Sequence, residues 1–237
     1  MSKDRLIFCP LGGSGEIGGN MNLYAYGKED NQKWIIVDMG VSFADDSVPG
    51  IDLIMPDAGF IIEKKDDLLG IILTHAHEDH IGAVSHLWPD LKCKMYATPF
   101  TAALIFEKFK EKKIDISSYL EVVPLNSKIK LGEFEIDFVT LTHSILEPNG
   151  LCIKTPIGTV LHTGDWKIDP NPLIGNQIDE KKLKSIGDSG VSAMICDSTN
   201  IFSPGRAGSE SEVRDSLLRI MEIKTNRILV TSFASNV

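Results

Sequence analysis

The strongest chemical signal in the sequence is a group of four potential metal ligands within six residues. His75, His77, Asp79 and His80 follow the apolar run LLGIILT (68–74), which is predicted to be a buried strand. In an extended turn His75 and His77 can point to the same side, whereas Asp79 and His80 begin a helix, where neighbouring side chains diverge by about 100°. One pair can therefore serve one metal ion, and the other pair a second. Imidazole and carboxylate ligands suit zinc, with manganese as the alternative.

Two further donors are expected from later strands. His143 ends the alternating run FEIDFVTLTH (134–143), so we expect it at the edge of a sheet. Asp165 follows in LHTGD (161–165), where Gly164 allows a sharp exit from the strand. A carboxylate in that position can bridge two metal ions about 3.5–4 Å apart. We therefore predict that Asp165 bridges a two-metal site.

A glycine-rich motif near the N-terminus has two interpretations. The run GSGEIG (13–18) fits G-x-G-x-x-G and follows a predicted strand, and Asp38 lies 20 residues past Gly18, as in a dinucleotide site. Nucleotide binding requires a helix directly after the glycines, because the helix N-terminus holds the pyrophosphate. The following run MNLYAY (21–26) alternates like a strand. We therefore favour a tight glycine turn that lets a backbone pass close to the active site.

Composition sets bounds on the class of protein. The formal net charge of −9 gives a poor overall field for nucleic acid, although it leaves room for a metal-centred cleft. No apolar run of 18 residues occurs and the first residues form no signal peptide, so we expect a cytoplasmic protein without a membrane partner. The four scattered cysteines are interpreted as reduced, buried thiols.

The order of predicted elements indicates two packed sheets with helices outside, an αββα sandwich of the α/β class. Strands are predicted at 5–11, 21–26, 34–38, 68–74, 95–98, 119–125, 134–143, 151–156, 158–165, 191–198 and 227–233. Helices are predicted at 81–88, 101–113, 179–186 and, from a capping box at 209–212, through about residue 223. The strands at 191–198 and 227–233 are expected to be buried, and we interpret the end of the chain directly after the last one as a truncation.

The donor pattern resembles the metallo-β-lactamase superfamily, which carries an aspartate after an early strand, H-x-H-x-D-H, a later histidine and a later aspartate. The resemblance implies that His75, His77 and His143 hold the first metal. It implies that Asp79 and His80 hold the second metal and that Asp165 bridges the two. Asp38 would support the metal loop by hydrogen bonds.

Further motifs along nearly the whole chain resemble the ribonuclease J family of the β-CASP branch: LGGSGEIG (11–18), PGID (49–52), THAHEDHIG (74–82), HTGDWK (162–167), CDSTN (196–200) and TSFASN (231–236). This resemblance implies a metal-dependent ribonuclease with 5′-to-3′ exonuclease and endonuclease activity in RNA processing and decay, with two Zn²⁺ ions and RNA as partner. Asp79 or Asp197 would orient the attacking water or handle its proton. Gly50 and Asp52 would hold a structural Ca²⁺, and the full-length protein would be a homodimer.

The resemblance also implies an incomplete sandwich: residues 1–207 would form the metallo-β-lactamase domain, and 208–237 the start of an inserted β-CASP domain. The family's last ligand to the second metal is a histidine further downstream, so we expect a complete first site and an open second one. Neither His86 nor His162 replaces it; both are interpreted as structural. Two alternatives stay open: a thioester or lactam hydrolase of the same fold, which CDSTN (196–200) argues against, and an inactive fragment that only binds metal.

Overall fold

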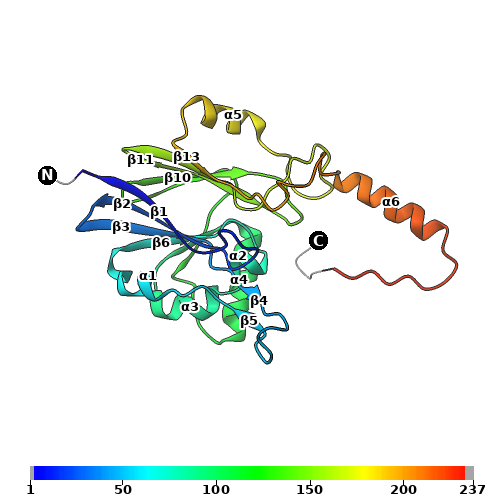
Figure 1. Cartoon of the computed structure of the whole chain (residues 1–237), viewed down its shortest axis with the longest axis horizontal. Helices are drawn as coiled ribbons and strands as arrows, with labels where there is room; N and C mark the ends of the chain where they lie inside the picture. The colour runs from blue at the N-terminus through cyan, green and yellow to red at the C-terminus, as the bar shows by residue number, and fades with distance from the viewer. Residues whose placement is uncertain (1–2, 233–237) are drawn as a thin grey trace.

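The computed structural model describes residues 3–232 and contains two facing sheets with helices on their outer faces (Figure 1). The first sheet has six strands in the order β1 (Arg5–Gly12), β2 (Met21–Lys28), β3 (Asn31–Val37), β6 (Leu68–Ile72), β7 (Met95–Ala97) and β8 (Leu120–Val122). The second has five in the order β13 (Ala193–Ile195), β12 (Gly158–His162), β11 (Asn149–Thr155), β10 (Phe134–Thr140) and β9 (Lys128–Leu131). Strands β4 (Ser42–Phe43) and β5 (Leu53–Ile54) form a separate two-stranded ribbon.

Helices cover both outer faces, which confirms the predicted αββα sandwich (Figure 1). The first sheet is covered by α1 (Gly59–Glu63), α3 (Val84–Leu91) and α4 (Pro99–Glu111). The short 3₁₀ helix η1 (Lys65–Asp67) precedes strand β6, and α2 (Glu78–Ile81) follows it. The second sheet is covered by α5 (Glu180–Asp188). Helix α6 (Glu210–Glu222) begins with the predicted capping box, extends away from the sheets and has no buried residue after its cap.

Strand β2 shows how the sequence pattern builds two hydrophobic layers. Its side chains alternate between the faces of the sheet, so Tyr24 joins the cluster between the sheets while Leu23 and Ala25 join the cluster beneath the helices. Strand β6 is covered on both faces, which explains its continuous apolar sequence. The interior between the sheets is filled by residues such as Phe134 and Phe138 of β10.

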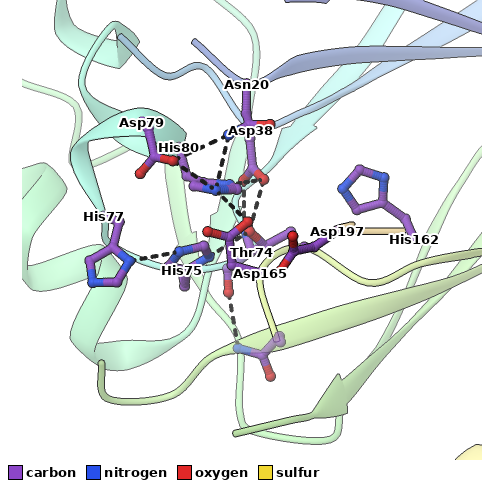
Figure 2. A network of polar contacts seen from close by, with 12 residues as sticks. Asn20, Asp38, Thr74, His75, His77, Asp79, His80, His162, Asp165 and Asp197 are labelled. Atoms are coloured by element: carbon purple, nitrogen blue, oxygen red, sulfur yellow. Dashed lines mark hydrogen bonds and ion pairs between the residues drawn. The ribbon is translucent and has the colours of Figure 1, made fainter. Parts of the chain in front are cut away.

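The directions of the strands decide where the polar residues meet. Strands β3 and β6 are parallel, so Asp38 and His75, which follow them, leave the first sheet at the same edge. Strands β10 and β12 are each antiparallel to β11 and so run parallel to each other. His143 and Asp165, which follow β10 and β12, therefore leave the second sheet at one edge. Figure 2 shows residues from both sheets converging there.

Two sequence predictions about strands are wrong. Residues 227–232, the described part of the strand predicted at 227–233, form no strand, and Leu229 is 89% exposed. An extended segment becomes a β-strand only when a neighbouring strand forms backbone hydrogen bonds with it. Apolar side chains alone do not provide that neighbouring strand. Strand β13 exists but lies at the edge of its sheet, so Met194 is 47% exposed and the strand is not buried as predicted.

Smaller differences have local causes. The helix predicted at 81–88 is divided between α2 and α3. The predicted list of strands omits β9, which has four residues, and the two-residue strands β4 and β5, because such short segments show little alternation. All four cysteines are free, but the prediction that they are buried holds for Cys152 alone. Cys9 and Cys93 are half-buried, and Cys196, which follows the edge strand β13, is exposed. Within residues 3–232, no helix combines the length and the apolar character that crossing a membrane requires.

Candidate metal centre

The first group of donors contains three histidines and one carboxylate. Ligand atoms of His75, His77, His143 and Asp165 all lie within 4.8 Å of one another. His77 Nδ1 is 3.2 Å from His75 Nε2 and 3.1 Å from His143 Nε2. Nitrogens bound at 2.0–2.1 Å to one tetrahedral zinc ion lie roughly 3.3 Å apart. The three imidazoles therefore have the spacing of ligands that share an ion, and the donor set fits zinc.

The protonation of these histidines also suits metal binding. Burial lowers the pKa of His75 well below its usual value, and the neighbouring histidines lower it further. Burial lowers the pKa of His143 to about 4, although the carboxylate of Asp165 opposes the shift. Both imidazoles are therefore neutral at pH 7, and a neutral imidazole is the form that binds a metal ion.

The second group of donors contains Asp79, His80 and Asp165, so Asp165 belongs to both groups. Its Oδ1 lies 3.1 Å from His80 Nε2, and its Oδ2 lies 3.7 Å from His143 Nε2. Asp79 Oδ2 lies 3.6 Å from His80 Nε2. The two oxygens of Asp165 thus face different donor groups, which is the arrangement that a bridging carboxylate needs.

Asp38 is buried beside the centre and contacts one candidate ligand, His80, directly (Figure 2). Its Oδ2 lies 2.7 Å from His80 Nδ1, which leaves Nε2 of that ring directed at the donor group. The same carboxylate accepts hydrogen bonds from Thr74 N and Thr74 Oγ1, both at 2.8 Å. Burial lowers the pKa of His80, but the carboxylates of Asp38 and Asp165 outweigh it and raise this pKa well above its usual value.

Thr74 and Asn20 take part in this network but were not singled out in the sequence. Thr74 Oγ1 lies 3.0 Å from His75 Nδ1, so it connects that ring to Asp38. Asn20 Nδ2 lies 3.1 Å from His80 Nε2 and 3.4 Å from Asp79 Oδ2. Thr74 could have been found as the polar residue that ends a buried strand beside the histidines. Asn20 is too far from them in sequence for any spacing rule to indicate it.

The glycine turn brings Asn20 to the centre. Gly13, Gly15 and Gly18 all have positive φ, and no helix follows them before β2. Asn20 N donates to Asp79 O at 2.9 Å, so the backbone passes directly along the candidate site. The interpretation as a tight turn is confirmed, and the helix that dinucleotide binding requires is absent from this described segment.

Gly40 permits a second close approach of backbone to the site. A Cβ atom on Gly40 would lie 1.6 Å from Asp79 O. The flanking residues are hydrogen-bonded to the same helix turn, with Met39 N donating to His80 O at 2.7 Å and Val41 N donating to Glu78 O at 3.0 Å. The segment after β3 and the first turn of α2 are therefore held against each other at van der Waals distance.

Asp197 lies beside the two donor groups, on a cleft that Asp79 and Asp165 also line. Its Oδ1 accepts a hydrogen bond from Thr199 N at 2.9 Å, and its N–H donates to Thr163 Oγ1 at 3.0 Å. Among the described residues, Asp197 belongs to neither donor group. Its carboxylate is thus held at the rim of the centre, separate from the candidate ligands.

The remaining sequence candidates lie away from the ligands. His162 is buried, its Nδ1 lies 2.8 Å from the hydroxyl of Tyr24, and burial lowers its pKa to about 4. His86 is exposed on α3. The buried, hydrogen-bonded position of His162 agrees with the structural role predicted for it, whereas the structural role of the exposed His86 stays a prediction. Gly50 and Asp52 lie on the exposed segment between β4 and β5, outside the donor groups found in residues 3–232, and a calcium site there stays a prediction.

Comparisons with known proteins agree with this geometry. The Metallo-beta-lactamase superfamily profile matches residues 16–231. The whole chain is 44% identical to Ribonuclease J of Sinorhizobium meliloti and 38% identical to Ribonuclease J of Helicobacter pylori, and it covers 42% and 34% of those proteins. A crystal structure of a protein of unknown function from Enterococcus faecalis has a similar fold, with a TM-score of 0.63 and 18% identity over 94% of this chain and 58% of that one. The chain spans less than half the length of these curated relatives, and the predicted resemblance to ribonuclease J is confirmed.

Proposed function

The chain belongs to the metallo-β-lactamase superfamily, and we propose that it is the metal-binding portion of a ribonuclease that hydrolyses RNA phosphodiester bonds. One observation carries the proposal: two groups of donors share Asp165, and they come from segments that follow strands of both sheets. Such a pair of sites is suited to in-line displacement at phosphorus. The substrate class is proposed from the likeness over the whole chain to proteins named Ribonuclease J. That likeness does not favour a thioester or lactam hydrolase.

Each candidate ligand has a proposed role. His75, His77 and His143 would hold the first ion, Asp79 and His80 the second, and Asp165 would bridge them. Two zinc ions bound there, or manganese ions in their place, would lower the pKa of a water and neutralise charge on the phosphoryl oxygens.

The protein's own residues would complete the chemistry. Asp38 would keep the His80 ring oriented through its 2.7 Å contact with Nδ1. Of the two candidate catalytic residues, Asp79 is committed to a donor group, whereas Asp197 lies beside it on the same cleft. Asp197 is therefore the better placed of the two to accept a proton from the attacking water.

The overall charge bears on how RNA would be held. A net charge of −9 repels a polyanion at long range, so attraction would have to be local. Ions held by the two donor groups would supply such a local positive charge. We therefore propose that RNA binding depends on the ions themselves more than on surface lysines and arginines.

For the longer protein we propose what the family resemblance implies. It would be a cytoplasmic 5′-to-3′ exonuclease and endonuclease active in RNA processing, including that of ribosomal RNA, and it would form a homodimer. Residues 1–207 would be its metallo-β-lactamase domain, and 208–237 would begin the inserted β-CASP domain. Gly50 and Asp52 would hold a structural calcium ion.

The test combines metal analysis with hydrolysis by the chain of residues 1–237. Zinc per chain would be measured by elemental analysis, and hydrolysis would be followed with 5′-labelled RNA and with bis(p-nitrophenyl) phosphate, each with and without EDTA. We expect zinc binding with the first site the tighter one, and only weak, EDTA-sensitive hydrolysis, because the second donor group has three residues where the first has four. His77→Ala should lose zinc from the first site and lose hydrolysis.

His86→Ala is the matched control, because His86 is an exposed histidine on the neighbouring helix α3. This variant should keep both the zinc and the hydrolysis of the unmodified chain. Hydrolysis that survives EDTA or His77→Ala would contradict the proposal. Metal binding without hydrolysis of either substrate would favour the alternative of an inactive, metal-binding fragment.

A further inference from the structure

A buried carboxylate connects the candidate metal loops to the first turn of α6. Asp169 is fully buried, and its Oδ1 accepts hydrogen bonds from Ser209 Oγ at 2.7 Å and from Asn171 N at 2.9 Å. Its Oδ2 accepts from Glu210 N at 2.9 Å and lies 3.3 Å from Lys167 Nζ. These four groups satisfy both oxygens of a charge that would otherwise be costly to bury.

The loop that contains Asp169 is also tied to the segment that carries His143. Lys167 N donates to Thr142 O at 2.8 Å, and Thr142 Oγ1 donates to Lys167 O. Asp169 N in turn donates to Thr142 Oγ1 at 3.2 Å. Thr142 directly precedes His143, and Lys167 lies two residues after Asp165. The segments that carry these two candidate ligands are therefore joined where Thr142 meets Lys167 and Asp169.

We propose that Asp169 is a positioning residue, which fixes the first turn of α6 to this joined point and thereby sets the relative positions of His143 and Asp165. The inference rests on the proposed metal-binding role of these two residues. A helix N-terminus favours a carboxylate, so α6 and the loop are held as one unit. Metal–ligand distances in proteins fall within about 0.2 Å of their standard values, so loosening this unit should weaken the site. The orientation of α6 and the geometry of the centre consequently depend on each other.

The test uses Co²⁺ as the probe, because its visible absorption reports the ligands around the ion. Asp169→Asn, Ser209→Ala and the unmodified chain of residues 1–237 would be titrated with Co²⁺ and then with competing Zn²⁺. We expect Asp169→Asn to weaken Co²⁺ binding about tenfold and to change the absorption spectrum of the bound ion. Ser209→Ala, which removes only one donor to Asp169, should cause a smaller loss in the same direction.

Asp179→Asn is the control, because Asp179 is likewise a carboxylate at the start of a helix, where it accepts a hydrogen bond from Lys182 N at 2.9 Å, but that helix is α5 and not α6. Its Co²⁺ affinity and spectrum should stay within twofold of the unmodified chain. Amide exchange at Glu210 would show whether each variant has loosened α6.

The outcomes separate the inference from the proposed function. Faster exchange at Glu210 with an unchanged Co²⁺ affinity and spectrum, in Asp169→Asn or in Ser209→Ala, would overturn the positioning role. If Asp169→Asn does not fold, Ser209→Ala alone decides by the same criterion. Failure of the unmodified chain to bind Co²⁺ or Zn²⁺ would instead overturn the metal centre, and this inference with it.

Discussion

At the scale of single residues, the centre depends on a carboxylate that is not itself a candidate ligand. Asp38 has a φ of 64°, is fully buried and reaches both His80 and the backbone of Thr74. A carboxylate on the far nitrogen of a histidine fixes the ring and its tautomer and increases its basicity as a ligand. The left-handed conformation of Asp38 is thus explained by the direction in which its side chain must point.

The role of Asp38 predicts the effect of Asp38→Asn. The amide has nearly the same size but lacks the charge that holds the proton on His80 Nδ1, so metal affinity should fall about 10- to 100-fold. Zinc competition with a chromogenic chelator would measure the change. Asp45→Asn, on the exposed segment that follows β4, should leave the affinity unchanged. An affinity within twofold of the unmodified chain in Asp38→Asn would contradict the role.

Asp169 gives a prediction for pH. Burial raises its pKa, but the hydrogen bonds from Ser209, Glu210 and Asn171 outweigh this and lower the pKa to about 2. An unfolded aspartate titrates near about 3.9, so the carboxylate stabilises the fold above that pH and loses this contribution as the pH falls toward 2. In metal-free protein, the stability advantage over Asp169→Asn should be constant above about pH 5 and shrink between about pH 4 and 2. Urea unfolding at a series of pH values would measure it, and an advantage that is unchanged at pH 2 would refute the expectation.

The sequence indicated every candidate ligand but not every residue that positions one. Four of the candidate ligands lie within the six residues from His75 to His80, a spacing that itself indicates a metal site. Asp165 is indicated because it follows a glycine at the end of a strand. Asn20 and Asp169 escaped notice for a shared reason. Their partners, Asp79 and Ser209, are 59 and 40 residues away, and contacts over such separations exist only after the strands have been arranged.

At the scale of elements, the segment after β3 packs so closely against helix α2 that adding one methyl group to Gly40 should disturb the contact. A Cβ on Gly40 would lie 1.6 Å from Asp79 O, a backbone atom that cannot rotate away. Gly40→Ala should therefore cost about 3 kcal/mol or more of unfolding free energy and displace the first turn of α2. Chemical denaturation would measure the loss.

Gly187 supplies the control for this substitution. It lies in α5, where an added Cβ meets nothing within 4 Å. Gly187→Ala should be neutral or should stabilise the protein by up to about 1 kcal/mol, because alanine favours helix more than glycine does. Equal effects of the two substitutions would mean that α2 is free to shift away from Gly40.

The strands could be predicted from the sequence where their apolar pattern indicated the layers that would cover them. Strands β2, β3 and β6 have the alternation or continuous apolar character that their place in a packed sheet requires. The apolar run at 227–232 has comparable composition, yet it forms no strand, and no strand within residues 3–232 lies beside it to pair with. Composition thus predicts that a segment can form a β-strand. Whether it does depends on whether the fold places another strand beside it.

At the scale of the whole molecule, the candidate ligands come from both sheets, which also meet through an apolar cluster and through polar contacts such as that of the Tyr24 hydroxyl with His162 Nδ1. His75 and His80 come from the segment after β6 of the first sheet, and His143 and Asp165 follow strands of the second. Ions bound there would cross-link the open edge of the sandwich and would bind only the folded chain. At a free concentration 100 times the Kd, one ion stabilises the fold by about 2.7 kcal/mol.

Removing the metal should therefore lower the melting temperature, by about 5 °C or more for a chain of this size. The comparison would be made by calorimetry on zinc-loaded protein before and after dialysis against EDTA, with zinc restored at the end to show that the loss is reversible. His77→Ala should already melt near the temperature of the metal-free protein and respond little to EDTA, because it lacks one imidazole of the first donor group. His86→Ala should respond as the unmodified chain does. An equal response in His77→Ala and His86→Ala would mean that zinc stabilises the protein from somewhere other than the edge where the two sheets meet.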